Sequence, residues 1–157
     1  MDNRTKSGEI LQNVGYALLS EGKTIRIKAH GYSMYPSIKP GSVILIEPIA
    51  IKGNPVVGEI IAVKKNNGLI IHRLSRINVK NAATTYIARG DSNAFEDRPV
   101  ELDAIAGRII GAEVGAGDDL PSDTSVNTSP KYYLNRMKVI GVILLKRIKR
   151  VLKSLRS

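Results

Sequence analysis

The segment VVGEIIAVKKNNGLIIHRLSRI, residues 56–77, decides the class of fold. Two runs rich in valine and isoleucine stand on either side of a short polar stretch, NNG, at residues 66–68. Apolar β-branched runs of this length, joined by an Asn-Gly pair, are typical of an antiparallel hairpin. We therefore predict that residues 56–65 and 67–77 form two paired strands.

Further short strands are predicted on both sides of this hairpin. Their apolar or alternating segments are TIRIKA (24–29), SVILIEP (42–48), TTYIARG (84–90) and DAIAGRIIGAEV (103–114). Near the N-terminus, residues 5–20 have apolar positions at helical spacing, and that helix should end near Gly22. Many short strands separated by Gly and Pro indicate a mostly-β domain built on a barrel or a rolled sheet.

The composition excludes several classes of protein. A chain of 157 residues suits one domain with a substantial core. It has no cysteine, which excludes disulfides, thiol catalysis and cysteine-based zinc sites. The N-terminus lacks the features of a secretory signal, and no stretch reaches the roughly 18 apolar residues of a spanning helix. The expected location is therefore the cytoplasm or the surface of a membrane.

The charge and composition divide the chain into three parts. Residues 1–114 hold the predicted strands, and residues 115–130 are rich in Gly, Asp, Ser, Thr and Pro, as in a linker. In residues 131–157, apolar side chains recur every three or four positions, which predicts an amphipathic helix. This last segment has nine Lys and Arg and no acid, so it carries nearly all of the net charge of +10.

A basic amphipathic helix at residues 131–157 has three candidate partners. Each basic residue near an anionic leaflet contributes about 1 kcal/mol, which favours peripheral membrane binding. The helix could instead pack on the domain or on another protein, and its positive charge could contact nucleic acid. Its other face is aliphatic and carries only two aromatic residues, so nucleic acid is the weakest of these readings.

Three short stretches hold residue types that could perform chemistry. GYSMYP contains Ser33, IIHRL contains His72, and GDSNAFEDR contains Asp91 and Asp97. A serine hydroxyl needs a base, an imidazole is the usual base near neutral pH, and a carboxylate can orient the imidazole. These residue types are common, so Ser33 could simply end a turn, His72 could be structural, and Asp91 could be a turn former.

The order and spelling of these stretches resemble the type I signal peptidase family. The likeness runs from about residue 29 to 112, and it is to the endoplasmic-reticulum and archaeal branch in particular. That branch has a Ser-Met-x-Pro box, a Gly-Glu-Ile strand, a His-Arg strand and a Gly-Asp-x-Asn turn followed by a second Asp. The resemblance implies the rolled and partly barrelled sheet of the clan that unites signal peptidases and repressor autoproteases.

The resemblance also implies roles for individual residues. Ser33 matches the nucleophile, and its backbone N–H would contribute to the oxyanion hole. His72 falls where bacterial members have a lysine base and where this branch has histidine. Asp97 matches the third catalytic residue, while Asp91 matches an acid that we expect to shape the turn. The reaction implied needs no metal and no cofactor.

Other residues near the predicted nucleophile have supporting or competing roles. Gly31 stands where some bacterial members supply an oxyanion-hole hydroxyl, so this contribution is missing or comes from the backbone. Met34 and Pro36 are expected to fix the corner and to line the substrate groove. His30 is a weaker candidate for the base. Lys64 and its neighbour Lys65 are expected to be a solvated strand end, although repressor-type autoproteases use a lysine base.

The predicted function is that of a serine endopeptidase, which cleaves signal-like or leader peptides after small residues. The resemblance departs in one respect, because signal peptidases carry an N-terminal membrane anchor and this chain has its apolar basic helix at residues 131–157. One rival is an autoproteolytic regulator that cuts its own linker at Ala116–Gly117, although 28 residues leave no room for a DNA-binding helix-turn-helix before the domain. The other rival is a non-catalytic module that binds peptides or is tethered to a membrane.

Overall fold

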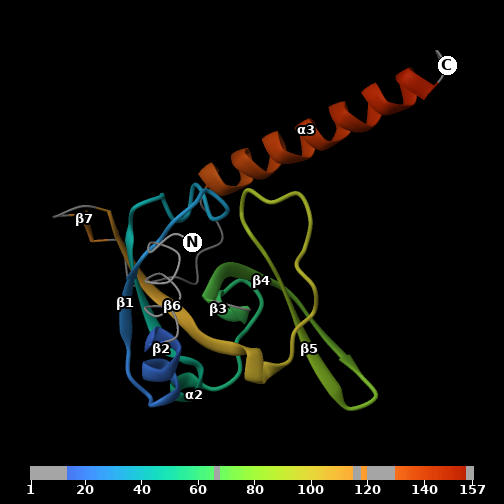
Figure 1. Ribbon diagram of the computed structural model, residues 1–157. Coiled ribbons are helices and arrows are strands. Elements are labelled where there is room, and N and C mark those ends of the chain that lie inside the picture. The colour runs from blue at the N-terminus through green and yellow to red at the C-terminus, as the bar shows by residue number, and fades with distance from the viewer. Residues whose placement is uncertain (1–13, 66–67, 115–117, 120–129, 155–157) are drawn as a thin grey trace, which may run out of the picture.

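The computed structural model describes residues 14–65, 68–114, 118–119 and 130–154. Its strands form one antiparallel sheet in the order β1-β2-β6-β3-β4-β5, and β7 pairs with the end of β6 (Figure 1). The bounds are β1 (Ile25–Lys28), β2 (Val43–Pro48), β3 (Ile60–Lys65), β4 (Gly68–Lys80), β5 (Ala83–Arg89), β6 (Ile105–Val114) and β7 (Asp118–Asp119). The mostly-β prediction is confirmed, and the sheet is rolled without closing into a barrel.

The predicted hairpin is present as β3 and β4, with Ile61 opposite His72. Its first strand begins four residues later than predicted, at Ile60. The backbone N–H of Val56 donates to the Glu59 carboxylate, and the Glu59 N–H donates to the Val56 carbonyl, so residues 56–59 form a turn. A side chain that satisfies the local backbone competes with strand pairing, which explains the shorter strand.

Helices account for the remaining described elements. Residues 14–20 are helical, and the earlier part of the predicted N-terminal helix lies outside the described residues. Two short helices that were not predicted are α2 (Ile49–Lys52) and η1 (Leu102–Ala104). The long helix α3 spans Pro130–Ser154. Within the predicted linker, β7 is a short strand, and the rest of residues 115–129 lies outside the described part.

Two groups of buried side chains form the core. The larger group centres on β2, where the alternate residues Ile44 and Ile46 are fully buried. It also includes Met34 and Ile38, which lie on the connection between β1 and β2. The smaller group lies around β3, β4 and β5 and includes Leu74. Because Met34 and Ile38 are buried in the larger group, the segment that carries Ser33 is anchored to the core.

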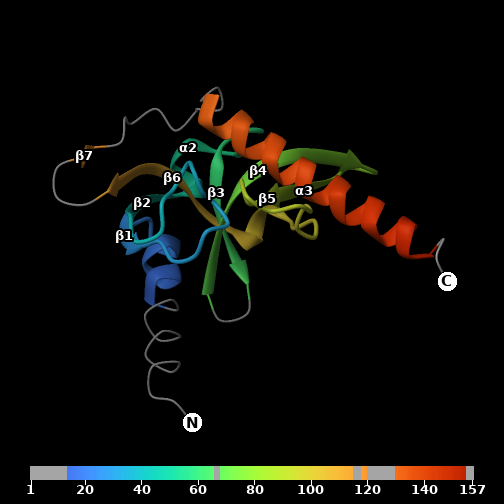
Figure 2. The ribbon, with the colours of Figure 1, turned by 90° about the horizontal axis from the view of Figure 1, so that it is seen from above.

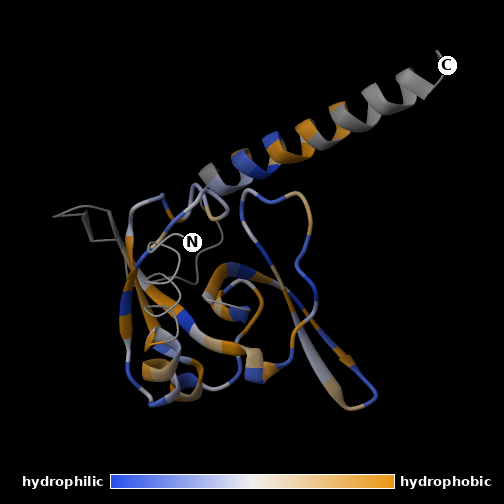
Figure 3. Ribbon diagram, in the orientation of Figure 1, coloured by the Kyte–Doolittle hydropathy of each residue, from blue (hydrophilic) through white to orange (hydrophobic). Residues whose placement is uncertain are grey.

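Helix α3 starts beside the connections β1–β2 and β5–β6 and then extends beyond the sheet (Figures 1 and 2). The part of α3 on the domain is hydrophilic, whereas hydrophobic residues gather farther along it (Figure 3). In the described parts of the chain, none of the helices has the length and apolar character needed to cross a bilayer.

Candidate active site

Ser33 lies on the connection between β1 and β2, which is closed at its base by backbone hydrogen bonds. The Ala29 N–H donates to the Ser42 carbonyl at 2.7 Å, and the Gly41 N–H donates back to the Ala29 carbonyl at 2.9 Å. Gly31 has φ +84°, a conformation that favours glycine over any residue with a side chain. The connection is therefore closed at its base, and Ser33 is half-buried on it.

The turn after β5 approaches the backbone of Ser33 closely. The Ser92 N–H donates to the Ser33 carbonyl at 2.8 Å, and the Ser92 hydroxyl donates to the Tyr35 carbonyl at 2.7 Å. A Cβ on Gly90 would lie 2.7 Å from the Ser33 carbonyl oxygen, which is closer than such atoms normally approach. Glycine at position 90 is thus what allows this turn to hold the Ser33 segment.

The side chains of His72 and Asp97 meet, as the resemblance to signal peptidases implied. His72 Nδ1 lies 2.5 Å from Asp97 Oδ2, and the two side chains are 8% and 34% exposed. The Asp97 N–H donates to the Ala88 carbonyl of β5 at 2.8 Å, which fixes the acid beside the sheet. A carboxylate accepts the Nδ1–H, and that tautomer leaves the lone pair on Nε2.

Ser33 and His72 line the same cavity, whose volume is about 310 Å³. Gly31, Met34 and His30 also contribute to its wall, so both histidines of the chain border it. Of the two, His72 is the one that contacts Asp97. Pro36 is half-buried, follows a cis peptide bond and is not part of this wall, so its role in a substrate groove stays a prediction.

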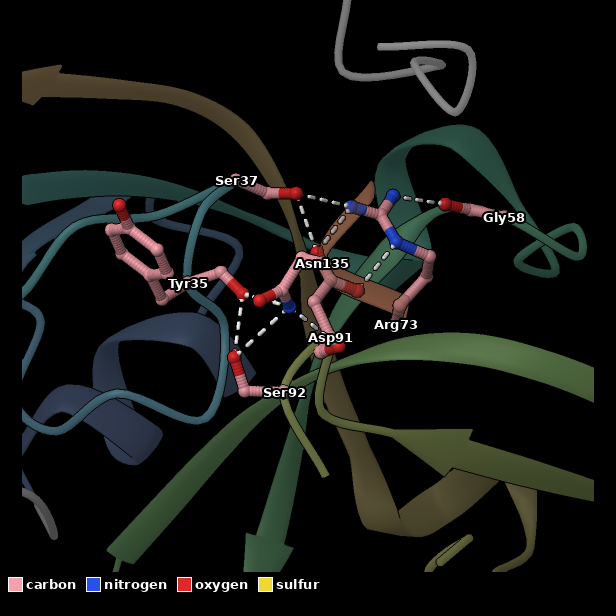
Figure 4. A network of polar contacts seen from close by, with 7 residues as sticks. All are labelled: Tyr35, Ser37, Gly58, Arg73, Asp91, Ser92 and Asn135. Carbon is pink, nitrogen blue, oxygen red and sulfur yellow. Dashed lines mark hydrogen bonds and ion pairs between the residues drawn. The ribbon is translucent and has the colours of Figure 1, made fainter. Parts of the chain in front are cut away.

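Asp91 lies at the centre of a second, buried polar network (Figure 4). Its two carboxylate oxygens each accept a 2.9 Å hydrogen bond from the Arg73 guanidinium. The Ser37 hydroxyl donates to Asp91 Oδ2 at 2.5 Å, and Arg73 Nη1 donates to the Gly58 carbonyl at 2.9 Å. Bidentate pairs of this kind are geometrically specific. The network joins the Ser33 connection, β4 and the turn after β5.

The sequence reasoning gave no role to Arg73 or Ser37. The pattern His-Arg was part of the resemblance, but an arginine in a strand usually has its charge in water. Arg73 is buried here because Asp91 reaches it from the turn after β5. The two residues are 18 positions apart, so neither local segment predicts their contact. The lysines at the end of β3 are exposed as predicted, and the Lys64 ammonium lies 3.9 Å from the centre of the Tyr16 ring.

The start of α3 also contacts the candidate site, which the sequence did not reveal. Asn135 Nδ2 lies 3.1 Å from the Tyr35 carbonyl oxygen, 3.3 Å from the Asp91 carbonyl oxygen and 3.3 Å from the Ser92 hydroxyl (Figure 4). One amide thus contacts both the Ser33 connection and the turn with the acids. The only available signal was an asparagine, a poor helix former, in the second turn of a predicted helix.

Two further side chains of α3 reinforce this contact. Arg136 Nη1 donates to the Asn93 carbonyl at 2.7 Å. Burial of this guanidinium, with the charge of Arg89 as a second cause, lowers the pKa of Arg136. The Tyr132 ring lies 5.3 Å from the guanidinium carbon of Arg73, within the range of a cation–π interaction. The first turns of α3 therefore pack against the Ser33 connection and the Asp91 network, beside the cavity and not in its wall.

Residues 6–111 match the family model described as Peptidase S24-like, which is more than half of the chain. The chain therefore belongs to the Peptidase S24-like family, within the wider group that contains signal peptidases. This family includes peptidases and autoproteolytic repressors. The matched range includes Ser33, His72, Asp91 and Asp97, and it ends before α3. No curated protein matches the chain.

Proposed function

We propose that the protein is a serine endopeptidase in which Ser33 is the nucleophile, His72 the general base and Asp97 the residue that orients His72. The contact between His72 and Asp97, beside a cavity that Ser33 also lines, is the observation that carries this proposal. Family membership supports it, because the Peptidase S24-like family includes peptidases.

The proposed reaction has two stages. His72 Nε2 removes the proton of Ser33 Oγ as the oxygen attacks the scissile carbonyl carbon, and Asp97 stabilises the imidazolium that forms. His72 then returns the proton to the leaving amine as the C–N bond breaks, which leaves an acyl ester on Ser33. In the second stage His72 takes a proton from water as the water oxygen attacks the acyl carbon of the ester. The bond from that carbon to Ser33 Oγ then breaks, His72 returns the proton to Ser33 Oγ, and the acid product is released. In this proposal the Ser33 N–H donates a hydrogen bond to the developing oxyanion. Gly31 has no side chain, so any contribution it makes to the oxyanion hole comes from its backbone.

The residues at the cavity favour the histidine branch of the signal peptidases over a lysine mechanism. His72 contacts Asp97 and lines the cavity, whereas Lys64 lies at the exposed end of β3 over Tyr16. We accordingly propose substrates like those of that branch, namely signal-like or leader peptides cut after small residues. Met34 in the cavity wall would contact the peptide, and an extended peptide could add to a sheet edge.

The test is intact-mass spectrometry after incubation with peptides that contain an Ala-x-Ala sequence, for wild type and Ser33→Ala. Cleavage after the small residue by wild type alone is expected. The rate should fall towards acidic pH because a protonated imidazole cannot accept the Ser33 proton. An ordinary lysine is still charged near pH 8 and could not accept the proton there. A rate that rises only above this pH would transfer the role of base to a lysine.

Self-cleavage is a second candidate function, because the family includes autoproteolytic repressors. The predicted cut at Ala116–Gly117 lies outside the described residues. The same spectra distinguish the two functions. Cutting of the chain itself near Ala116, at a rate independent of protein concentration and absent from Ser33→Ala, would favour the autoprotease. If both proteins bind peptide equally and neither cleaves any peptide or itself, the chain is a non-catalytic module.

A further inference from the structure

Helix α3 contacts the domain through one side of its first turns. Asn135 reaches the Tyr35 and Asp91 carbonyls, and Arg136 reaches the Asn93 carbonyl. These hydrogen bonds come from two separate connections of the domain, so they fix how α3 is rotated about its own axis. The side that carries Asn135 faces the domain.

The opposite side of α3 is an exposed apolar stripe, formed by Tyr133, Met137, Ile140 and Leu144. An α-helix turns by about 100° per residue, so these positions lie roughly 140° to 200° around the helix from Asn135. The contact that fixes Asn135 on the domain therefore directs the stripe away from the domain. Figure 1 shows that α3 extends away from the domain after its first turns. The four side chains of the stripe are 43% to 68% exposed.

The charge of the segment indicates what covers the stripe. Residues 131–157 carry nine Lys and Arg and no acid, whereas the preceding part of the chain is almost neutral. A helix with a continuous apolar stripe and many basic residues on its other sides is suited to lie in the interface of an anionic membrane. We propose that α3 binds an anionic lipid surface through the stripe of Tyr133, Met137, Ile140 and Leu144.

This orientation places the candidate site close to the lipid. The residues that Asn135 and Arg136 contact belong to the Ser33 connection and to the turn that carries Asp91. With the stripe on the membrane, that part of the domain lies directly behind the first turns of α3. If the proposed peptidase function holds, its substrates are peptides that emerge at a membrane surface. Lipid binding itself does not depend on that function.

The experiment is co-sedimentation of the full chain with phosphatidylcholine vesicles, with and without a phosphatidylglycerol fraction. Wild type should bind the anionic vesicles and bind neutral vesicles much more weakly. The double variant Met137→Ser and Leu144→Ser should lose at least about tenfold in binding to the anionic vesicles, because two buried apolar side chains are removed. Circular dichroism of each variant confirms that the fold and helix content are retained.

The chain provides a matched control at Val142. Its exposed fraction is 51%, against 52% for Leu144, but Val142 lies on the side of α3 that carries Asn135. Val142→Ser should therefore bind as wild type does. Equal losses for Val142→Ser and the double variant, or equal binding to neutral and anionic vesicles, would overturn the proposal. So would a dimer in sedimentation velocity without lipid that the double variant dissociates, since a second copy would then occupy the stripe.

Discussion

Two acid–base pairs stand side by side in this protein and have opposite environments. His72 and Arg73 are neighbours on β4, and their partners Asp97 and Asp91 come from the same connection between β5 and β6. The Asp91 side chain is 1% exposed, whereas that of Asp97 is 34% exposed. Arg73 makes a bidentate pair that holds a fixed charge, while His72 makes one contact and borders a cavity.

The difference shows how one short strand segment can serve two purposes. Arginine stays protonated at any physiological pH, so the Arg73–Asp91 pair is suited to holding connections together. An imidazole exchanges its proton near neutral pH, and the cavity gives a substrate access to it. Four substitutions can break or sharpen this contrast, and we take them from the largest expected effect to the smallest.

His72→Ala should abolish peptidase activity while leaving the fold in place. Loss of the base in a serine peptidase typically lowers kcat by roughly 10⁴ to 10⁶. Urea unfolding should show a much smaller effect than the loss of activity, because Asp97 remains partly solvated. His30→Ala is the matched control and should retain activity. If His30→Ala is the inactive variant instead, the base has been assigned to the wrong histidine.

Asp97→Asn should lower kcat by about 10³ to 10⁴ with little change in KM. The amide has the shape of the carboxylate, but it can donate to Nδ1 and so favours the tautomer that cannot act as a base at Nε2. Steady-state kinetics and thermal unfolding of the same preparation separate chemistry from stability. An activity within tenfold of wild type would mean that Asp97 is structural, like Asp91.

Asp91→Ala should act on stability, because it leaves the buried Arg73 charge without its carboxylate. Breaking a buried ion pair typically costs about 3 to 5 kcal/mol. The free energy of unfolding in urea should fall by that amount, and activity should be lost in parallel with the folded fraction. Replacing both partners, as Arg73→Met with Asp91→Leu, should recover much of this loss. A stable but inactive Asp91→Ala protein would place Asp91 in the chemistry.

Asn135→Ala should have the smallest effect, and it should lower both stability and kcat. Its amide contacts three acceptors, and each such hydrogen bond contributes about 0.5 to 1.5 kcal/mol. We expect kcat to fall roughly three- to tenfold, because the Ser33 connection and the turn with the acids are then less firmly joined. Asn135→Gln, which keeps the amide, should restore part of the rate, and the exposed Lys138→Ala should leave it unchanged. Stability lost without any fall in kcat would make Asn135 purely structural.

The sequence predicted the local features of the fold and much less of its long-range packing. The two strands of the β3–β4 hairpin follow from apolar patterning. The predicted start of β3 was wrong because the Glu59 carboxylate accepts a hydrogen bond from the Val56 N–H and stabilises a turn there. The His72–Asp97 contact was anticipated through the family resemblance. The burial of Arg73 and the docking of Asn135 were not, since each depends on segments brought together only in the folded chain.

The contact of Asn135 with Tyr35 also sets an order of events during synthesis. The two residues are 100 positions apart, and Asn135 belongs to α3, which follows all the described strands in the chain. At the usual 5 to 20 residues per second, roughly 5 to 20 s separate their incorporation. During that interval the strands can fold while the Ser33 connection still lacks its final restraint. The nascent chain therefore completes its candidate site late, when most of the sheet is already formed.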